Sequence, residues 1–80
     1  MLKLLYFAAL VDMLGMASEK LEAPLPSDVR GLIGLLKQRG GAWEEVFSKG
    51  SVRITVNKQF AEMNTPLKAE DEVAFISAWI

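Results

Sequence analysis

Three adjacent carboxylates are the densest group of reactive side chains in the sequence. Glu70, Asp71 and Glu72 follow one another, a pattern that could bind a metal ion or pair an acid with a base. Side chains of consecutive strand residues point to opposite faces, so three adjacent carboxylates converge poorly on a single atom. We therefore interpret the run as a polar turn that precedes a strand.

The chain contains neither cysteine nor histidine. It therefore has no thiolate ligand, no cysteine nucleophile and none of the side chains that most often serve as general base or metal ligand. We expect no metal, no cofactor and no catalytic residue. Any part in a reaction would be that of a non-catalytic subunit, which leaves the status of the chain as an enzyme open.

Net charge and hydropathy limit the possible partners. Nine basic and ten acidic residues give a formal charge of -1, which favours neither nucleic acid nor an anionic membrane. The longest apolar stretch, Leu4 to Val11, is far shorter than the ~20 residues that span a bilayer. We expect a cytoplasmic protein with a protein partner. The length suffices for one core, so residues 1–80 are predicted to form a single domain.

The first part of the chain predicts a hairpin of strands. Leu2 to Ala9 is apolar on both faces, as in a central strand, and the face that carries Lys3 should point away from the core. Leu10 to Leu14 could form a helical turn that Gly15 stops, and Ser18 to Leu25 would pair with the first strand.

A helix is predicted next. Ser27 is the expected N-cap, and Asp28 would lie in the first turn. Apolar residues with helical spacing follow, namely Val29, Leu32, Ile33 and Leu36. Gly31 and Gly34 lie inside the helix, where their small size would let it approach a sheet closely.

The second half predicts a helix end, a further turn and two strands. Gly40-Gly41 is placed to end the helix with a left-handed C-cap, and a short turn after it should bury Trp43 and Phe47. Val52 to Val56 alternates between apolar and polar residues, and Glu72 to Ile76 gives a last strand. The predicted order β-β-α-β-β is that of a two-layer α+β domain.

Three motifs carry a family resemblance. They are LKLLYFAAL followed by LG, then VRITVNKQF, then TPLKAEDEVAF, in that order along residues 1–76. With them the chain resembles the small, sulfur-carrying subunits of molybdopterin synthase. The resemblance implies a ubiquitin-like β-grasp fold, in which the first and last strands pair in parallel at the centre of a mixed sheet and one main helix packs on one face.

The resemblance also implies a function and two partners. A family member ends in Gly-Gly, whose carboxylate is adenylated by a ubiquitin-activating-like enzyme, converted to a thiocarboxylate and delivered to the large catalytic subunit. Here residues 76–80 read Ile-Ser-Ala-Trp-Ile, and the only glycine pair, Gly40-Gly41, is internal. Three explanations for the different ending are open: a replaced or frameshifted tail, a paralogue without carrier activity, and a differently processed precursor. The precursor is the least favoured.

The resemblance places partner binding on the sheet. The matching positions are Phe7, Phe60 and Ile76, and strand parity puts Phe7 and Ile76 on the face opposite the helix. A core position is the alternative, above all for Phe60. Arg53, Lys58 and Lys68 could steer an acidic partner or could simply be solvated.

Two other functions compete with a molybdopterin synthase subunit. The first is a catalytically silent β-grasp module that binds a protein without sulfur chemistry. The second is a relative of the thiamine-pathway sulfur carrier, whose chains are usually shorter and lack a middle segment such as Gly40 to Lys49.

Overall fold

The fold is built around two apolar strands from opposite ends of the chain. The computed structural model describes residues 1–49 and 52–77. The helices and strands are, in chain order, β1 (Leu2–Phe7), α1 (Ala9–Leu14), β2 (Ser18–Leu21), α2 (Val29–Lys37), α3 (Gly41–Ser48), β3 (Val52–Val56), β4 (Gln59–Phe60) and β5 (Glu72–Ser77).

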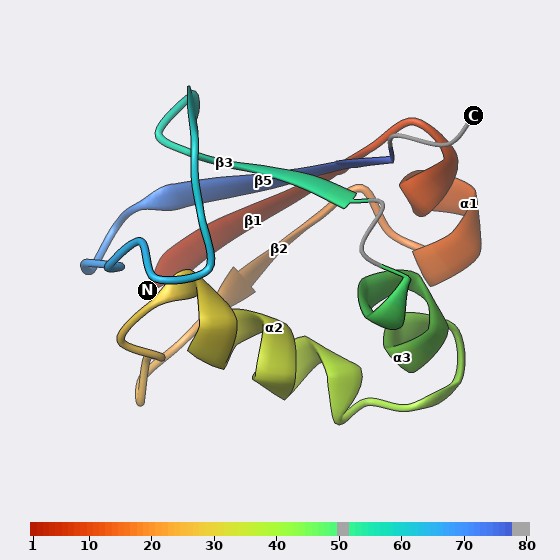
Figure 1. Cartoon of the computed structure of the whole chain (residues 1–80), viewed down its shortest axis with the longest axis horizontal. Helices are drawn as coiled ribbons and strands as arrows, with labels where there is room; N and C mark the ends of the chain where they lie inside the picture. The colour runs from red at the N-terminus through yellow and green to blue at the C-terminus, as the bar shows by residue number, and fades with distance from the viewer. Residues whose placement is uncertain (50–51, 78–80) are drawn as a thin grey trace.

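The strands form one mixed sheet of order β2-β1-β5-β3-β4. β1 and β5 pair in parallel at its centre, and the other neighbours are antiparallel. Figure 1 shows the sheet as one layer with α2 and α3 beneath it and α1 at one end. The predicted α+β class with a ubiquitin-like β-grasp arrangement is confirmed.

The core lies between this sheet and the helices. On β1 the side chains of Leu2, Leu4 and Tyr6 are fully buried, so the prediction that Lys3 faces the other way is correct. Val73 and Phe75 of β5 continue the same layer. From α2 the core receives all four residues of the predicted helical stripe, Val29, Leu32, Ile33 and Leu36.

The start of α2 differs from the prediction in one residue. Asp28, not Ser27, is the N-cap, because its backbone is extended at φ -150° and its Oδ1 accepts a hydrogen bond of 2.8 Å from the Gly31 N–H. The expected role of the helix glycines is also wrong. A Cβ on Gly31 would meet Asp28 and Pro26 rather than the sheet, and a Cβ on Gly34 would meet nothing within 4 Å.

The glycine pair links two helices. Gly40 and Gly41 have positive φ values of 75° and 56°, which glycine adopts without strain. They do not cap α2, however, because that helix ends at Lys37 with a right-handed residue after it, and Gly40 is the N-cap of α3. Phe47 of α3 is buried, and the half-buried Trp43 packs against the core as expected.

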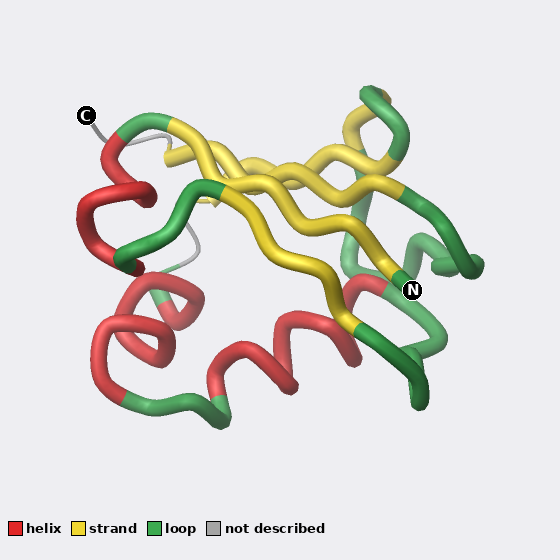
Figure 2. Tube along the Cα trace, turned by 180° about the vertical axis from the view of Figure 1, so that it is seen from behind, coloured by secondary structure: helices red, strands yellow, loops and turns green. Residues whose placement is uncertain are grey.

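The helices are short, as the view from behind in Figure 2 shows. The longest, α2, has 9 residues, and no helix in the described ranges is long and apolar enough to cross a bilayer. α1 and its left-handed end at Gly15 match the predicted helical turn.

The β3–β4 hairpin was not predicted, so the described residues form a sheet of five strands where the sequence indicated four. Its turn residues Asn57 and Lys58 have positive φ values of 51° and 71°, as a two-residue hairpin turn with right-handed twist requires. β2 is also shorter than predicted and ends at Leu21, before the prolines.

Candidate functional site: the open face of the sheet

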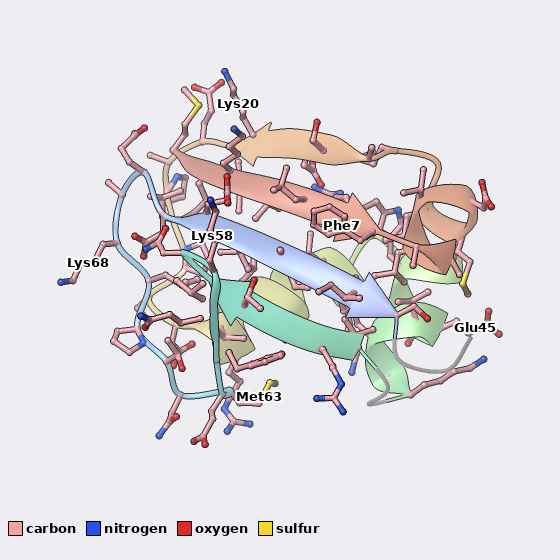
Figure 3. The ribbon with its side chains drawn as sticks, turned by 90° about the horizontal axis from the view of Figure 1, so that it is seen from above. Phe7, Lys20, Glu45, Lys58, Met63 and Lys68 are labelled. Carbon is pink, nitrogen blue, oxygen red and sulfur yellow. The ribbon has the colours of Figure 1, made fainter. Side chains whose placement is uncertain are left out.

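Strand register divides the sheet into two faces. All three helices contribute buried side chains to one face, and none of them covers the other, which we call the open face. Figure 3 looks down on it. Register assigns to the open face Ser18 and Lys20 from β2, Lys3, Leu5 and Phe7 from β1, Glu72, Ala74 and Ile76 from β5, Arg53 and Thr55 from β3, and Phe60 from β4.

An apolar patch occupies the centre of the open face. Phe7 and Ile76 are register partners on the parallel strands β1 and β5, and Leu5 is the partner of Ala74 one pair earlier. We call these four residues the apolar patch, in which Ala74 is buried and Leu5 and Ile76 are half-buried. Phe7 is 45% exposed although it is a large hydrophobic side chain, and it stands on the open face in Figure 3. Because such groups gain free energy when they leave water, the patch is suited to a protein partner.

Phe60 lies at the edge of the same face. It is the register partner of Thr55 and is 75% exposed, so the alternative reading of Phe60 as a core residue is wrong. Its ring lines the mouth of a groove of about 690 Å³ that also contacts Ile33 and Phe47 beneath β3. The sheet thus brings the Phe7 and Ile76 pair together and places Phe60 two strands away.

Basic side chains surround the patch. Lys3 is 3.8 Å from Glu72, and neither Lys20 nor Arg53 has a carboxylate within 4.0 Å among the residues that the structure describes. Lys58 sits at the tip of the β3–β4 hairpin, which rises above the sheet on the open side (Figures 1 and 2). Lys68 lies farther out, on the loop before β5 (Figure 3).

The acidic run Glu70, Asp71 and Glu72 lies at the start of β5 and forms hydrogen bonds there. Glu70 accepts a hydrogen bond of 2.8 Å from the N-terminal amine, and Asp71 accepts one of 3.0 Å from the Asn57 amide and one of 2.8 Å from the Lys68 N–H. The Asn57 hydrogen bond, followed by that of Lys68, lowers the pKa of the Asp71 carboxyl. The described residues contain no group of three carboxylates placed to hold a metal ion. These carboxylates therefore fix the chain beside β5, consistent with the predicted turn.

A polar network that runs from the buried Tyr6 to the surface supports the opposite face of the sheet. The Tyr6 hydroxyl donates a hydrogen bond of 2.7 Å to Glu19, and the Arg39 guanidinium binds both oxygens of Glu19 at 2.8 and 3.0 Å. Arg39 also stacks 4.4 Å from the centre of the Trp43 ring. The network joins β2 to the segment between α2 and α3. No sequence pattern indicated this network, because Glu19 and Arg39 are distant in the chain and meet only in the folded protein.

Burial and charge set the pKa values in this network. Burial has the largest effect and raises the pKa of the Tyr6 hydroxyl above its ordinary value, and the Glu19 carboxylate raises it further. Tyr6 therefore remains a hydrogen-bond donor. Burial by itself raises the pKa of Glu19, but the hydrogen bonds from Arg39 and Tyr6 outweigh it and hold that pKa below its ordinary value. The network is therefore a fixed ion pair with a hydroxyl donor rather than a proton-transfer site.

The described chain ends where β5 reaches the start of β3. Ser77 is the register partner of Val52 and is 6% exposed. Its Oγ has no hydrogen-bond partner within the described part of the chain. The predicted alteration of the sulfur-carrying tail concerns Ser77, Ala78, Trp79 and Ile80, of which the last three lie outside the described residues.

Known proteins share this architecture and part of the sequence. The sequence model of the ThiS family matches residues 4–79. Among solved structures, a molybdopterin converting factor subunit 1 from Pyrococcus furiosus is 28% identical, with a TM-score of 0.80 over 95% of this chain and 94% of that one. No curated protein sequence matches the chain.

Two more distant structures share the fold. SAMP1 from Haloferax volcanii is 20% identical, with a TM-score of 0.79 over 95% of this chain and 92% of that one. Subunit 1 of the molybdopterin-converting factor from Helicobacter pylori, solved in complex with subunit 2, is 21% identical, with a TM-score of 0.68 over 95% and 90% of the two chains. Together the matches confirm the resemblance to molybdopterin synthase small subunits and the sulfur-carrier fold.

Proposed function

The chain belongs to the ThiS family, and we propose that it acts in molybdenum cofactor biosynthesis as the small sulfur-carrier subunit of a molybdopterin synthase. Its partners would be the large catalytic subunit and an adenylating enzyme, both in the cytoplasm. The likeness to subunit 1 from Pyrococcus furiosus, which extends over 95% of the chain, supports this pathway. The observation that carries the proposal is the exposed Phe7 beside Ile76 on the open face.

The geometry suits a docking subunit. Phe7, Ile76 and, at the edge, Phe60 would contact the large subunit, which would cover the apolar patch. Ile76 is followed by Ser77, the last residue of β5, so a partner seated on the patch also lies next to the C-terminal end of that strand. The core beneath β1 and β5 holds that end in place.

The sulfur step needs a group that residues 76–80 do not provide. In the family a terminal glycine carboxylate attacks ATP to give an acyl adenylate and pyrophosphate, and sulfide then displaces AMP to leave a thiocarboxylate. A chain without side chains can enter the narrow site of a partner enzyme. We propose that the open face carries the docking function and that sulfur loading depends on a Gly-Gly end, which residues 51–80 do not contain.

Two alternatives stay in view. The chain would be a silent β-grasp interaction module if it binds a partner and never accepts sulfur. The ThiS family match favours the thiamine-pathway carrier as the other alternative. The segment Gly41–Ser48 argues against the thiamine-pathway carrier, because it forms α3 and thiamine-pathway chains usually lack such a segment.

Mass spectrometry of the intact chain tests the proposal. The chain and a variant with its last residues replaced by a Pro-Pro-containing tail that ends in Gly-Gly are each incubated with a molybdopterin-pathway adenylating enzyme, ATP and sulfide. We expect the variant alone to gain the mass of an oxygen-to-sulfur exchange and to bind the large subunit of molybdopterin synthase. A folded variant that gains no mass would refute the carrier proposal, and loading only by the thiamine-pathway enzyme would support the second alternative.

A further inference from the structure

Charge is distributed unevenly over the molecule. Four basic side chains, those of Lys3, Lys20, Arg53 and Lys58, lie on the open face or at the hairpin tip above it, and Glu72 is the single acid among the open-face residues. This region therefore carries an excess of three positive charges. The remaining five basic and nine acidic residues leave a charge of -4 on the rest of a chain whose formal charge is -1.

These basic groups are available to a partner. Lys20, Arg53 and Lys58 are exposed, and none of them forms an ion pair within the described residues. Two further carboxylates precede β5: Glu70 is paired with the N-terminal amine, whereas Asp71, hydrogen-bonded to the neutral Asn57 amide, keeps its charge beside the hairpin. With Asp71 counted beside Glu72, the four basic side chains still leave an excess of two positive charges around the patch.

The rim encloses the apolar patch on two sides. Lys20 belongs to the edge strand β2, whereas Arg53 and Lys58 belong to β3 and its hairpin on the other side of the central pair β1 and β5. Figure 3 shows Lys20 beside β2 and Lys58 over the start of β5, both toward the end of the sheet where β1 begins, with Phe7 farther along β1. A surface with this arrangement complements one that has an apolar centre and acidic flanks.

We propose that the open face binds a protein surface in which acidic side chains flank an apolar centre, and that Lys20, Arg53 and Lys58 accelerate the encounter with it. The inference rests on the proposed function, because it describes the docking surface of the large subunit. Exposed charges contribute little to the affinity of a bound complex but raise the rate at which partners meet, and salt screens them. The signature is therefore an association rate that depends on salt.

Stopped-flow measurement of binding to the large subunit of molybdopterin synthase tests the inference. The variant Lys20→Glu with Lys58→Glu reverses two rim charges. A matched control, Arg30→Glu with Lys37→Glu, makes the same change in net charge on α2, beneath the sheet. Unfolding curves of both variants verify that each is folded.

We expect the association rate of the native chain to fall about tenfold between about 20 mM and about 500 mM NaCl. The rim variant should associate about tenfold more slowly at low salt and lose the salt dependence, whereas the control should match the native chain. Equal effects of the two variants, or a salt-independent rate, would overturn the inference while leaving docking intact. No binding at any salt concentration would overturn the inference together with the proposed docking function.

Discussion

Phe7 and Ile76 are register partners on parallel neighbouring strands, and their side chains lie together on the face that no described helix covers. One comes from the first strand and the other from the last, so the pair exists only once the chain has folded. The same pairing buries Tyr6 against Phe75 on the opposite face, where their rings stack at 5.5 Å. The strands that hold the core together thus also create the candidate binding surface.

The buried hydroxyl of Ser77 predicts a stabilising substitution. Its Oγ is shielded from water and unpaired within the described residues, which costs about 1–3 kcal/mol for such a group. Ser77→Ala should therefore raise the free energy of unfolding by about 1 kcal/mol in urea titration. Ser18→Ala, at an exposed position of β2, is the control and should have little effect. A loss of stability in Ser77→Ala would show that the hydroxyl has a partner.

The two glycines of α2 predict opposite outcomes for one substitution. Gly34→Ala should stabilise the protein by about 1 kcal/mol, because alanine favours the helix and a Cβ there meets nothing within 4 Å. Gly31→Ala should gain less or lose stability, because its Cβ would lie 3.3 Å from both Asp28 Oδ1 and Pro26 Cβ and press on the N-cap. Thermal unfolding of both variants measures the difference. Equal stabilisation of the two variants would contradict this prediction, because it would mean that the Asp28 cap moves away from the added Cβ at no cost.

The Glu19 network predicts a loss of stability in acid. Its carboxyl has a pKa below the ordinary value of about 4.3, because hydrogen bonds from Arg39 and Tyr6 outweigh the effect of burial. A lowered pKa in the folded state stabilises the protein above the unfolded pKa, and this contribution is lost as pH falls through the folded pKa. Stability should therefore be full above about pH 5 and decline below about pH 4.

Removing the carboxylate tests this assignment. Glu19→Gln should lower the free energy of unfolding at neutral pH by about 1.5–3 kcal/mol and weaken its decline in acid. Some decline should remain, since the pKa values of Glu70 and Asp71 are also lowered. Glu45→Gln, at an exposed site on α3, should leave the stability at neutral pH unchanged. An unaltered acid profile in Glu19→Gln would contradict the role of the network.

Local patterns predicted much of the fold. The stripe of Val29, Leu32, Ile33 and Leu36 is buried as its spacing indicated, because the period of a helix places these residues on one side. Strand alternation likewise placed Phe7 and Ile76 on one face. The parallel pairing of the outer segments came from the family resemblance, since periodicity carries no information about strand order.

Features that depend on contacts distant in sequence were not predictable. Glu19 and Arg39 meet only because β2 lies above the end of α2, and neither residue stands out in the sequence. The hairpin at Asn57 and Lys58 lacks the glycine that usually marks such a turn, so β4 and the position of Phe60 were missed. Ser27 and Asp28 are both good N-caps, and the backbone geometry decides between them.

Calorimetric titration of Phe7→Ala against the large subunit of molybdopterin synthase tests the central claim most directly. Leu35→Ala is the matched control, because Leu35 is 40% exposed on α2 whereas Phe7 is 45% exposed on the open face. The account predicts that Phe7→Ala weakens binding at least about tenfold, as expected for a buried aromatic anchor, while Leu35→Ala binds like the native chain. Unchanged binding of Phe7→Ala, or an equal loss in both variants, would contradict docking through the open face.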